Sequence, residues 1–430
     1  MRVHRLAWRR GSRTGAQRGV PQVGLLGLFG QGNLGNDGSL EAVLAYLRDR
    51  HPGATLDVRC NQPGLVSAQY GIPATQLRWF RPEDHQEPGL TGKARKALGI
   101  GLGLGIDAVR TTGWVRRHDT VIVPGMGVLE ATLPLRPWHL PYVMYLLGRS
   151  GRMFGTKVAL VSVGSNVIQQ RATRQLVVAA ARLARYRSFR DPRAREAMRT
   201  MGVDTAGDPV YPDLAFSLPE PAGVRVVPGA VGVGVMEYSG SNDDRHRADE
   251  IRTAYIAGMT RFVLWLVDQG RPVRLLAGDT IDQRVVDGVV GDVRAQRPDL
   301  APEALIAEPA YTLGQLMQQL ATVQTVVATR YHTVICALKL GKPTLSVGYG
   351  AKFDALMAAM EMTDFTQSAR ALDVDRMVEQ FGELERRAPE LTAMVTAHTA
   401  ASAELLDRQF DQLSALLFPT ARPLLKEITQ

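Results

Sequence analysis

Short apolar runs typical of buried strands alternate with helical patterns through most of the chain. Four such runs lie in the first half: VGLLGLF (23–29), ATLDVRC (54–60), DTVIVPG (119–125) and KVALVSVG (157–164). The pattern restarts in the second half with GAVGVGVMEYSG (229–240). Strands separated by helices cannot pair through tight hairpins, so they form parallel sheets that helices cover. The sequence therefore predicts an α/β fold of two doubly wound, Rossmann-like domains that face each other across a cleft.

A proline-rich segment, LPEPAG (218–223), separates the two halves. We expect a flexible basic tail over residues 1–20, an N-terminal domain over 21–220, a C-terminal domain over 223–385 and a helical segment over 386–430. Ligands of doubly wound sheets bind beyond the carboxyl ends of the strands. The loops that follow the apolar runs are therefore the candidate sites of chemistry.

The charge of the chain limits its partners. The 430 residues carry a net charge of +9, with 44 arginines and seven lysines. This balance favours anionic ligands such as phosphates and carboxylates. The arginines are dispersed and do not alternate with aromatic residues, which argues against nucleic acid. No apolar run approaches the ~20 residues of a membrane span, and the Arg-rich first residues lack an apolar segment of signal-peptide type, so we expect a cytoplasmic protein.

The cysteines give no sign of a metal site. Cys60 and Cys336 lie far apart in the sequence and form neither a disulfide framework nor a CxxC motif. No cluster of His, Cys and carboxylate residues has the spacing of metal ligands either. We therefore predict no bound metal.

A glycine-rich loop follows the first apolar run. Its GQGNLG segment (30–35) has the glycine spacing of the dinucleotide-binding fingerprint. In that fingerprint the helix begins within the glycines, so that its free N–H groups reach the pyrophosphate. Here we expect the helix to begin only at about Leu40, with Asp37 or Ser39 as its N-cap. The loop is then too long for the fingerprint, and the sequence argues against NAD.

The same loop can hold another ligand. Gly35 gives access to the backbone, and Asn33, Asn36 and Asp37 offer polar contacts. The alternative is that these polar side chains only satisfy turns and cap the helix.

A second loop concentrates charge at a predicted helix start. Arg330 and His332 follow an apolar run that ends near Ala328. Free N–H groups at a helix start favour an anion, an arginine offers a planar fork for phosphate or carboxylate, and histidine titrates near neutrality. Lys352, beyond the next strand, is a candidate third cation. The alternative is an arginine paired to a carboxylate and a histidine that caps the helix.

Taken in order, four motifs between residues 24 and 375 resemble those of the polysaccharide pyruvyl transferase family. They are the loop Asn33-Leu34-Gly35-Asn36-Asp37, the pair Gly125 and Gly127 in DTVIVPGMGVLE, the block YRSFRDPRAREAMRTMG and PDLAF with Arg190, Asp191 and Asp213, and the group Arg330, His332 and Lys352. The family's usual Gly-Asp-Glu reads Gly35-Asn36-Asp37 here, so the first acidic residue stands one position later.

The resemblance implies a glycosyltransferase-B-like fold with the acceptor on the N-terminal domain and the donor on the C-terminal domain. It implies transfer of pyruvate from phosphoenolpyruvate onto two hydroxyls of a sugar as a cyclic ketal, in cell-surface glycan or glycolipid biosynthesis. Phosphoenolpyruvate is a substrate, so no cofactor is expected. The acceptor would be a glycan or a lipid-linked sugar.

Residue roles follow from this resemblance. The phosphate and carboxylate of the donor need several cations, and the implied ones are Arg190, Arg330 and Lys352. His332 would protonate the methylene carbon of the donor, and Asp37 or Asp213 would accept the proton of a sugar hydroxyl. The remaining predicted substrate-binding residues are Asn33, Gly35, Asn36, Gly125 and Gly127.

Two other functions fit the same architecture. Two-domain nucleotide-sugar glycosyltransferases of the retaining type commonly carry a Glu-x7-Glu motif in the second domain, but no glutamate occurs between Glu308 and Glu361. A non-catalytic binder of anionic glycans or lipids would use the segments WHLPYVMYLLGRSGRMFG (138–155) or ALGIGLGLGIDAV (97–109), the latter preceded by GKARK. Either segment could dock peripherally on the inner face of a membrane or form an ordinary helix that packs on the sheet.

Overall fold

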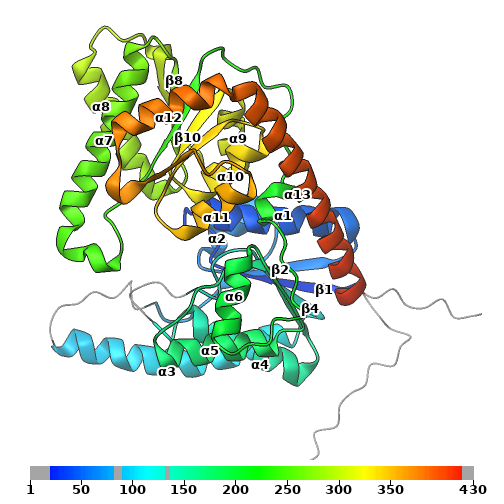
Figure 1. Cartoon of the computed structure of the whole chain (residues 1–430). Helices are drawn as coiled ribbons and strands as arrows, with labels where there is room; N and C mark the ends of the chain where they lie inside the picture. Colours follow the sequence, from blue (N-terminus) through cyan, green and yellow to red (C-terminus); the bar gives the residue numbers. More distant parts are fainter. Residues whose placement is uncertain (1–19, 82–89, 131–135, 419–430) are drawn as a thin grey trace, which may run out of the picture.

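The N-terminal half forms a parallel six-stranded sheet in the order β3-β2-β1-β4-β5-β6 (Figure 1). The computed structural model describes residues 20–81, 90–130 and 136–418. The strands are β1 (Gln22–Leu26), β2 (Thr55–Cys60), β3 (Ala74–Gln76), β4 (Thr120–Pro124), β5 (Lys157–Val163) and β6 (Tyr186–Phe189). The central strand β4 is buried along its whole length, as expected where helices cover both faces of a sheet.

Helices follow the strands of this sheet. They are α1 (Leu34–Arg50), α2 (Pro63–Tyr70), α3 (Leu90–Val115), α4 (Leu140–Phe154), α5 (Arg171–Leu183) and α6 (Pro192–Thr200), with a short 3-10 helix η2 (Leu214–Ser217) before the linker. Figure 1 shows α3, α4 and α5 together at the edge of the domain that faces away from the second sheet.

The C-terminal half repeats the same winding. Its sheet has the order β12-β11-β10-β7-β8-β9, with β7 (Val231–Val235), β8 (Val273–Ala277), β9 (Leu305–Ala307), β10 (Thr325–Ala328), β11 (Thr344–Gly348) and β12 (Thr366–Ser368). The helices are α7 (Ala248–Asp268), α8 (Gln283–Gln296), α9 (Leu313–Ala321), α10 (Tyr331–Lys339), α11 (Ala351–Ala359), α12 (Val374–Arg386) and α13 (Ala388–Leu417), and the 3-10 helices are η3 (Asn242–Arg247), η4 (Thr280–Asp282), η5 (Pro302–Ala304) and η6 (Ala369–Ala371). The predicted fold class is confirmed.

In each sheet the first and fourth strands of the domain are neighbours, β1 beside β4 and β7 beside β10. The strand order reverses at these pairs, and such switch points open a crevice beyond the carboxyl ends of the strands. Most of the predicted site residues lie in loops that follow β1, β4 and β10, at the two crevices, whereas Arg190 and Asp213 come after β6 and Lys352 comes after β11.

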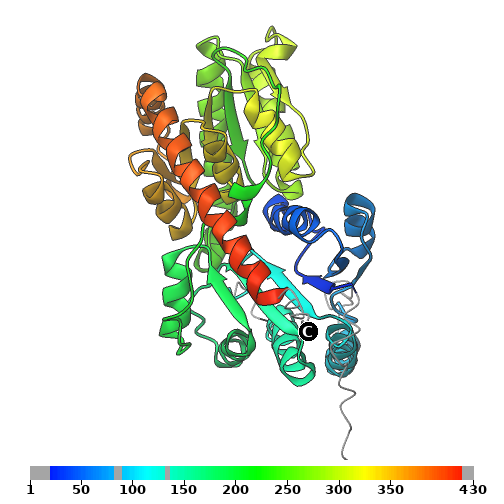
Figure 2. The same ribbon diagram turned by 90° about the vertical axis from the view of Figure 1, so that its right-hand side faces the viewer.

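The long helix α13 returns from the C-terminal domain to the first sheet (Figure 2). At the C-terminal domain, the hydroxyl of Thr399 donates to the carbonyl of Leu338 in α10 at 3.2 Å. At the N-terminal domain, the fully buried amide of Gln409 accepts from Ser162 at 3.0 Å and donates to Ser188 at 2.7 Å. These buried bonds tie the two domains together, so the crevices face each other.

Helix α1 begins at Leu34, six residues before the predicted start, and its N-cap is Asn33. The Oδ1 atom of Asn33 accepts a hydrogen bond from the amide of Asn36 at 3.2 Å. The prediction of a start at Leu40, with Asp37 or Ser39 as the cap, is therefore wrong. Glycines are poor helix formers, but the Asn33 cap and the burial of the first turn outweigh their low propensity. The length of the loop consequently no longer argues against a dinucleotide.

Candidate active site

The two crevices meet at the start of α1. Gly35 lies in its first turn against the imidazole of His332, and a Cβ atom at this position would overlap the ring. Just before the helix, the carbonyl of Gly32 accepts from the amide of Thr280 at 3.1 Å. Asn33 forms an isolated antiparallel β-bridge with Asp279. The start of α1 is thus held directly against the carboxyl edge of the second sheet. Its free N–H groups lie beside those at the start of α10, and such groups favour an anion.

Two of the predicted cations gather around one aromatic ring. Arg190, which follows β6, lies with its guanidinium carbon 5.2 Å from the ring centroid of Tyr331. The ammonium of Lys352, in the first turn of α11, lies 5.0 Å from the same centroid. The ring therefore brings together one cation from each domain, although the two residues are far apart in the sequence.

Arg190 is buried and surrounded by carboxylates. Its Nη2 donates to Glu130 at 2.9 Å, and its Nη1 lies 3.7 Å from Asp213. Its Nε has no hydrogen-bond partner among the described residues. This Nε lies 3.9 Å from Asp191, so three carboxylates surround the guanidinium, but of its five donors only one makes a hydrogen bond to them.

His332 and Asp213 form a second buried pair. Their Nε2 and Oδ2 atoms are 3.7 Å apart, too far for a hydrogen bond. Neither atom finds another hydrogen-bond partner within the described part of the chain. Buried polar atoms are rarely left unsatisfied unless they have a functional use, so this pair is a candidate for contact with a substrate.

Asp213 remains ionised in this setting. Burial would raise the pKa of its carboxyl, but the neighbouring His332 and Arg190 and the amide of Ala215 outweigh burial and lower the pKa to about 2. An ionised carboxylate beside an imidazole orients the ring and stabilises a positive charge on it.

A cavity of about 340 Å³ lies between the domains, and His332 adjoins it through Asp213 without being one of its lining residues. Arg190 and Asp213 contribute from the N-terminal domain, Tyr331 and Lys352 from the C-terminal domain. Helix α13 closes another side, with His398 and Ser402 among its contributions. The lining includes two cations, Arg190 and Lys352, and two carboxylates, Asp191 and Asp213, so a small anion would have to bind directly at the cations.

Asp37 has the opposite electrostatic character to Asp213. Its side chain is buried in the first turn of α1, and its Oδ1 accepts from the amide of Gly30 at 2.8 Å. Burial raises the pKa of this carboxyl to about 6, with a further rise from Asp279 and a partial offset from the Gly30 hydrogen bond. Asp37 can therefore exchange a proton near neutral pH, whereas Asp213 cannot.

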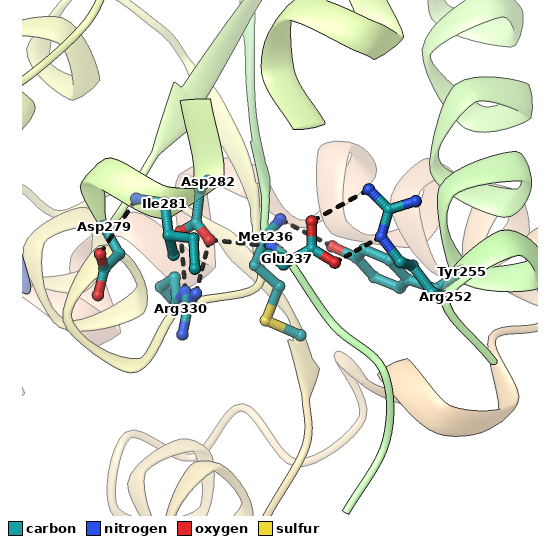
Figure 3. A network of polar contacts seen from close by, with 8 residues as sticks. All are labelled: Met236, Glu237, Arg252, Tyr255, Asp279, Ile281, Asp282 and Arg330. Carbon is teal, nitrogen blue, oxygen red and sulfur yellow. Dashed lines mark hydrogen bonds and ion pairs between the residues drawn. The ribbon is translucent and has the colours of Figure 1, made fainter. Parts of the chain in front are cut away.

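Arg330 is already paired within the protein (Figure 3). Its Nε and Nη2 donate to the two oxygens of the fully buried Asp282 at 2.8 and 2.6 Å. Asp282 also accepts from the amide of Glu237 at 2.9 Å. The structure thus has the arginine–carboxylate pair that the sequence left open as an alternative. The predicted role of Arg330 in substrate binding therefore depends on its Nη1, which makes neither of these two hydrogen bonds.

Four other predicted residues make contacts that fix the local course of the main chain. Asn33 caps α1, and the Nδ2 of Asn36 donates to the carbonyl of Leu28 at 3.4 Å. Gly125 has a φ of +51° and lies so close to Ser39 that a Cβ atom would collide with its hydroxyl. Gly127 packs in the same way against the carboxylate of Glu130. These positions bring α1 and Glu130 close to the carboxyl end of β4.

Four residues with contacts in this region were missed by the sequence interpretation: Glu130, Asp279, Asp282 and Tyr331. Three of them are carboxylates in loops that follow β4 and β8, the same signal that pointed to Arg330. Tyr331 adjoins the predicted pair, but nothing in the sequence shows that two distant cations share its ring. No group of three or more His, Cys, Asp or Glu residues in the described ranges is arranged to hold a metal ion.

Comparison with known proteins agrees with this architecture. A family model described as polysaccharide pyruvyl transferase matches residues 33–350. No curated protein matches the chain.

Solved structures of similar fold include the UDP-GlcNAc 2-epimerase of Neisseria meningitidis bound to UDP-GlcNAc, at 9% identity and a TM-score of 0.55, covering 90% of this chain and 100% of that one. They also include Anabaena Alr3699/HepE in complex with UDP-glucose, at 10% identity and a TM-score of 0.53, covering 92% and 99%. At such low identity the likeness establishes the fold alone, a glycosyltransferase-B-like pair of domains.

Replacing Gly35 with alanine should force α1 and α10 apart, because the new methyl group would overlap the His332 ring. Overpacking of this kind costs about 1–3 kcal/mol, which urea unfolding would measure. Gly105→Ala is the matched control, because no atom lies within 4 Å of its Cβ position. Alanine there should be neutral or stabilise α3 by up to about 1 kcal/mol. Equal stability of the Gly35→Ala variant and the wild type would show that the two helix starts do not touch in solution.

Asp37→Asn should remove a loss of folding stability that grows as the pH rises. An acid whose pKa is raised on folding, here from 3.8 to about 6, binds more protons when folded, so stability falls as pH rises through this window. The unfolding free energy of Asp37→Asn relative to wild type should therefore increase by roughly 2 kcal/mol between about pH 4 and pH 7. Urea unfolding at both pH values measures it. A difference that stays constant with pH would place the pKa of Asp37 in its ordinary range.

Proposed function

The chain belongs to the polysaccharide pyruvyl transferase family, and on this premise we propose that it transfers pyruvate from phosphoenolpyruvate onto two hydroxyls of a sugar, forming a cyclic ketal. The observation that carries the proposal is the cavity in which Arg190 and Lys352 share the Tyr331 ring beside the His332–Asp213 pair. This arrangement offers two cations and a proton donor within one site.

The donor suits this pair of cations. Phosphoenolpyruvate has a phosphate and a carboxylate on the same carbon, so its recognition needs two positive charges at close range. Arg190 would contact one anion through the donors that its hydrogen bond to Glu130 leaves unused. Lys352 acts as a compact point charge for the other. Arg330 would add its remaining Nη1 donor from the same helix start.

The reaction moves two protons from the sugar. The first hydroxyl oxygen bonds to C2 of the donor as the methylene carbon C3 takes a proton and becomes a methyl group. The C2–O bond to phosphate then breaks, and the second hydroxyl oxygen bonds to C2 to close the ketal. One sugar proton is balanced by the new C3–H bond, and the other leaves on phosphate.

His332 is the proposed acid for C3. It lies at the start of α10, and ionised Asp213 beside it stabilises the protonated ring. The low pKa of Asp213 makes this carboxylate a poor base at neutral pH. Of the two acceptors considered for the hydroxyl proton, Asp37 is therefore favoured, because an effective general base has a pKa near the working pH.

The acceptor is proposed to be a glycan or lipid-linked sugar of the cell envelope. The main alternative, a nucleotide-sugar glycosyltransferase, is favoured by one observation: solved structures of the same fold include Alr3699/HepE in complex with UDP-glucose. Binding measurements separate the two proposals, because they require different donors.

Phosphoenolpyruvate should raise the thermal unfolding temperature, and Lys352→Met should weaken its binding about tenfold to a hundredfold, the effect of losing one charge-assisted contact. Calorimetric titration measures the affinity. Lys342→Met is the control, because this lysine bonds the carbonyl of Ala321 outside the cavity. Unchanged affinity of the Lys352 variant would exclude this lysine from the donor site, and stabilisation by UDP-glucose in place of phosphoenolpyruvate would favour the glycosyltransferase.

His332→Gln should retain most of the phosphoenolpyruvate affinity and lose roughly 10²–10⁴-fold in turnover, the usual contribution of a general acid. Phosphate release in the presence of a panel of glycans and lipid-linked sugars measures turnover. The control is His246→Gln, because His246 is exposed in η3 and does not line the cavity. Turnover of His332→Gln within a few-fold of wild type would move the proton donor elsewhere, with Lys352 as the next candidate.

A further inference from the structure

Helix α3 presents an apolar stripe to solvent on one face. Leu98, Leu102 and Val109 are 65%, 55% and 75% exposed. Their spacing of four and seven residues places them on the same side of the helix. The positions between them on this side, Gly101 and Gly105, are also exposed. Large apolar side chains on one surface of a soluble domain mark an interaction site more often than single exposed residues do.

The opposite face of α3 is the one that packs on the domain. The carboxylate of Asp107 accepts from the amide of Trp79 at 2.8 Å, and the carbonyl of Leu104 accepts from Tyr142 at 3.2 Å. Trp114 donates to Asp57 in β2 at 3.0 Å. Packing among the residues that the structure describes therefore does not explain the apolar stripe.

Positive charge lies at the start of the same helix, where Lys93, Arg95 and Lys96 occupy the first two turns. The one acidic residue of the helix, Asp107, is buried on the inner face. The two partly exposed tryptophans near the helix lie on its inner face: Trp79 bonds Asp107 through its amide, and Trp138 lines a small cavity with Ile100 and Asp107.

We propose that α3 docks the protein on an anionic lipid surface, with Leu98, Leu102 and Val109 inserted at the headgroup boundary and the Lys93–Lys96 cluster on the lipid phosphates. An apolar stripe together with basic residues is the pattern of an interfacial helix. An anionic lipid surface complements the basic start of α3. No helix in the described residues is long and apolar enough to span a bilayer, so the contact is peripheral.

The position of α3 supports this arrangement. It lies at the outer edge of the N-terminal domain, and its first half extends beyond α4 and α5 (Figure 1). Nothing of the candidate active site is covered when this edge rests on a surface. If the proposed function holds, a protein held there meets acceptor sugars carried on lipids, but docking itself does not depend on that function.

Co-sedimentation of the full chain with vesicles tests the proposal without any substrate. The protein should sediment with vesicles of phosphatidylcholine and phosphatidylglycerol, bind pure phosphatidylcholine weakly, and lose affinity as salt is raised. Leu98→Ser with Leu102→Ser, and separately Lys93→Glu with Arg95→Glu and Lys96→Glu, should each weaken binding to the anionic vesicles roughly tenfold or more.

Matched controls are Leu65→Ser, at a site 61% exposed in α2, and Arg294→Glu in α8, and both should bind the vesicles as wild type does. Thermal unfolding confirms that every variant is folded. Wild-type vesicle binding by both α3 variants would overturn the proposal. So would light scattering that shows an oligomer in wild type and a monomer in Leu98→Ser with Leu102→Ser, because the stripe would then cover a second copy.

Discussion

The contact between Gly35 and His332 is the constraint on which the rest of the site depends. A glycine in the first turn of α1 lets the backbone of one domain touch the imidazole that begins α10 in the other. Because both helices start at the switch point of their sheets, this single close approach aligns the two crevices. The cavity around Tyr331 then receives Arg190 from one domain and Lys352 from the other.

The surroundings of two buried carboxylates in this region shift their pKa values in opposite directions. Asp213 is held ionised by His332 and Arg190, whereas burial keeps the pKa of Asp37 near neutrality. In enzymes, two neighbouring titratable groups whose pKa values differ strongly often act as the acid and the base of the reaction. A buried carboxylate of raised pKa also costs stability at neutral pH, which is a cost that a purely structural residue would not need.

The sequence predicted the layers of the fold because alternation of apolar runs and helices is a local signal. It also located the strand end that carries Arg330 and His332. It misplaced the start of α1 because the Asn33 cap and the packing of the first turn outweigh the low helix propensity of glycine. The pairing of Arg330 with Asp282 and the sharing of Tyr331 by two cations arise between segments that meet only in the folded chain, so local patterns could not reveal them. For the same reason, the sequence left open whether the segment 97–109 packs on the sheet or docks on a membrane. The structure shows that one face of this segment contacts the domain and that the other face is exposed.

A crystal structure of the protein soaked with phosphoenolpyruvate would test the central claim most directly. The account predicts that the ligand lies in the cavity beside the Tyr331 ring, with its phosphate and carboxylate on Arg190 and Lys352 and its methylene carbon facing His332. Density for the ligand elsewhere, with Arg190 and Lys352 bound only to protein groups, would contradict it.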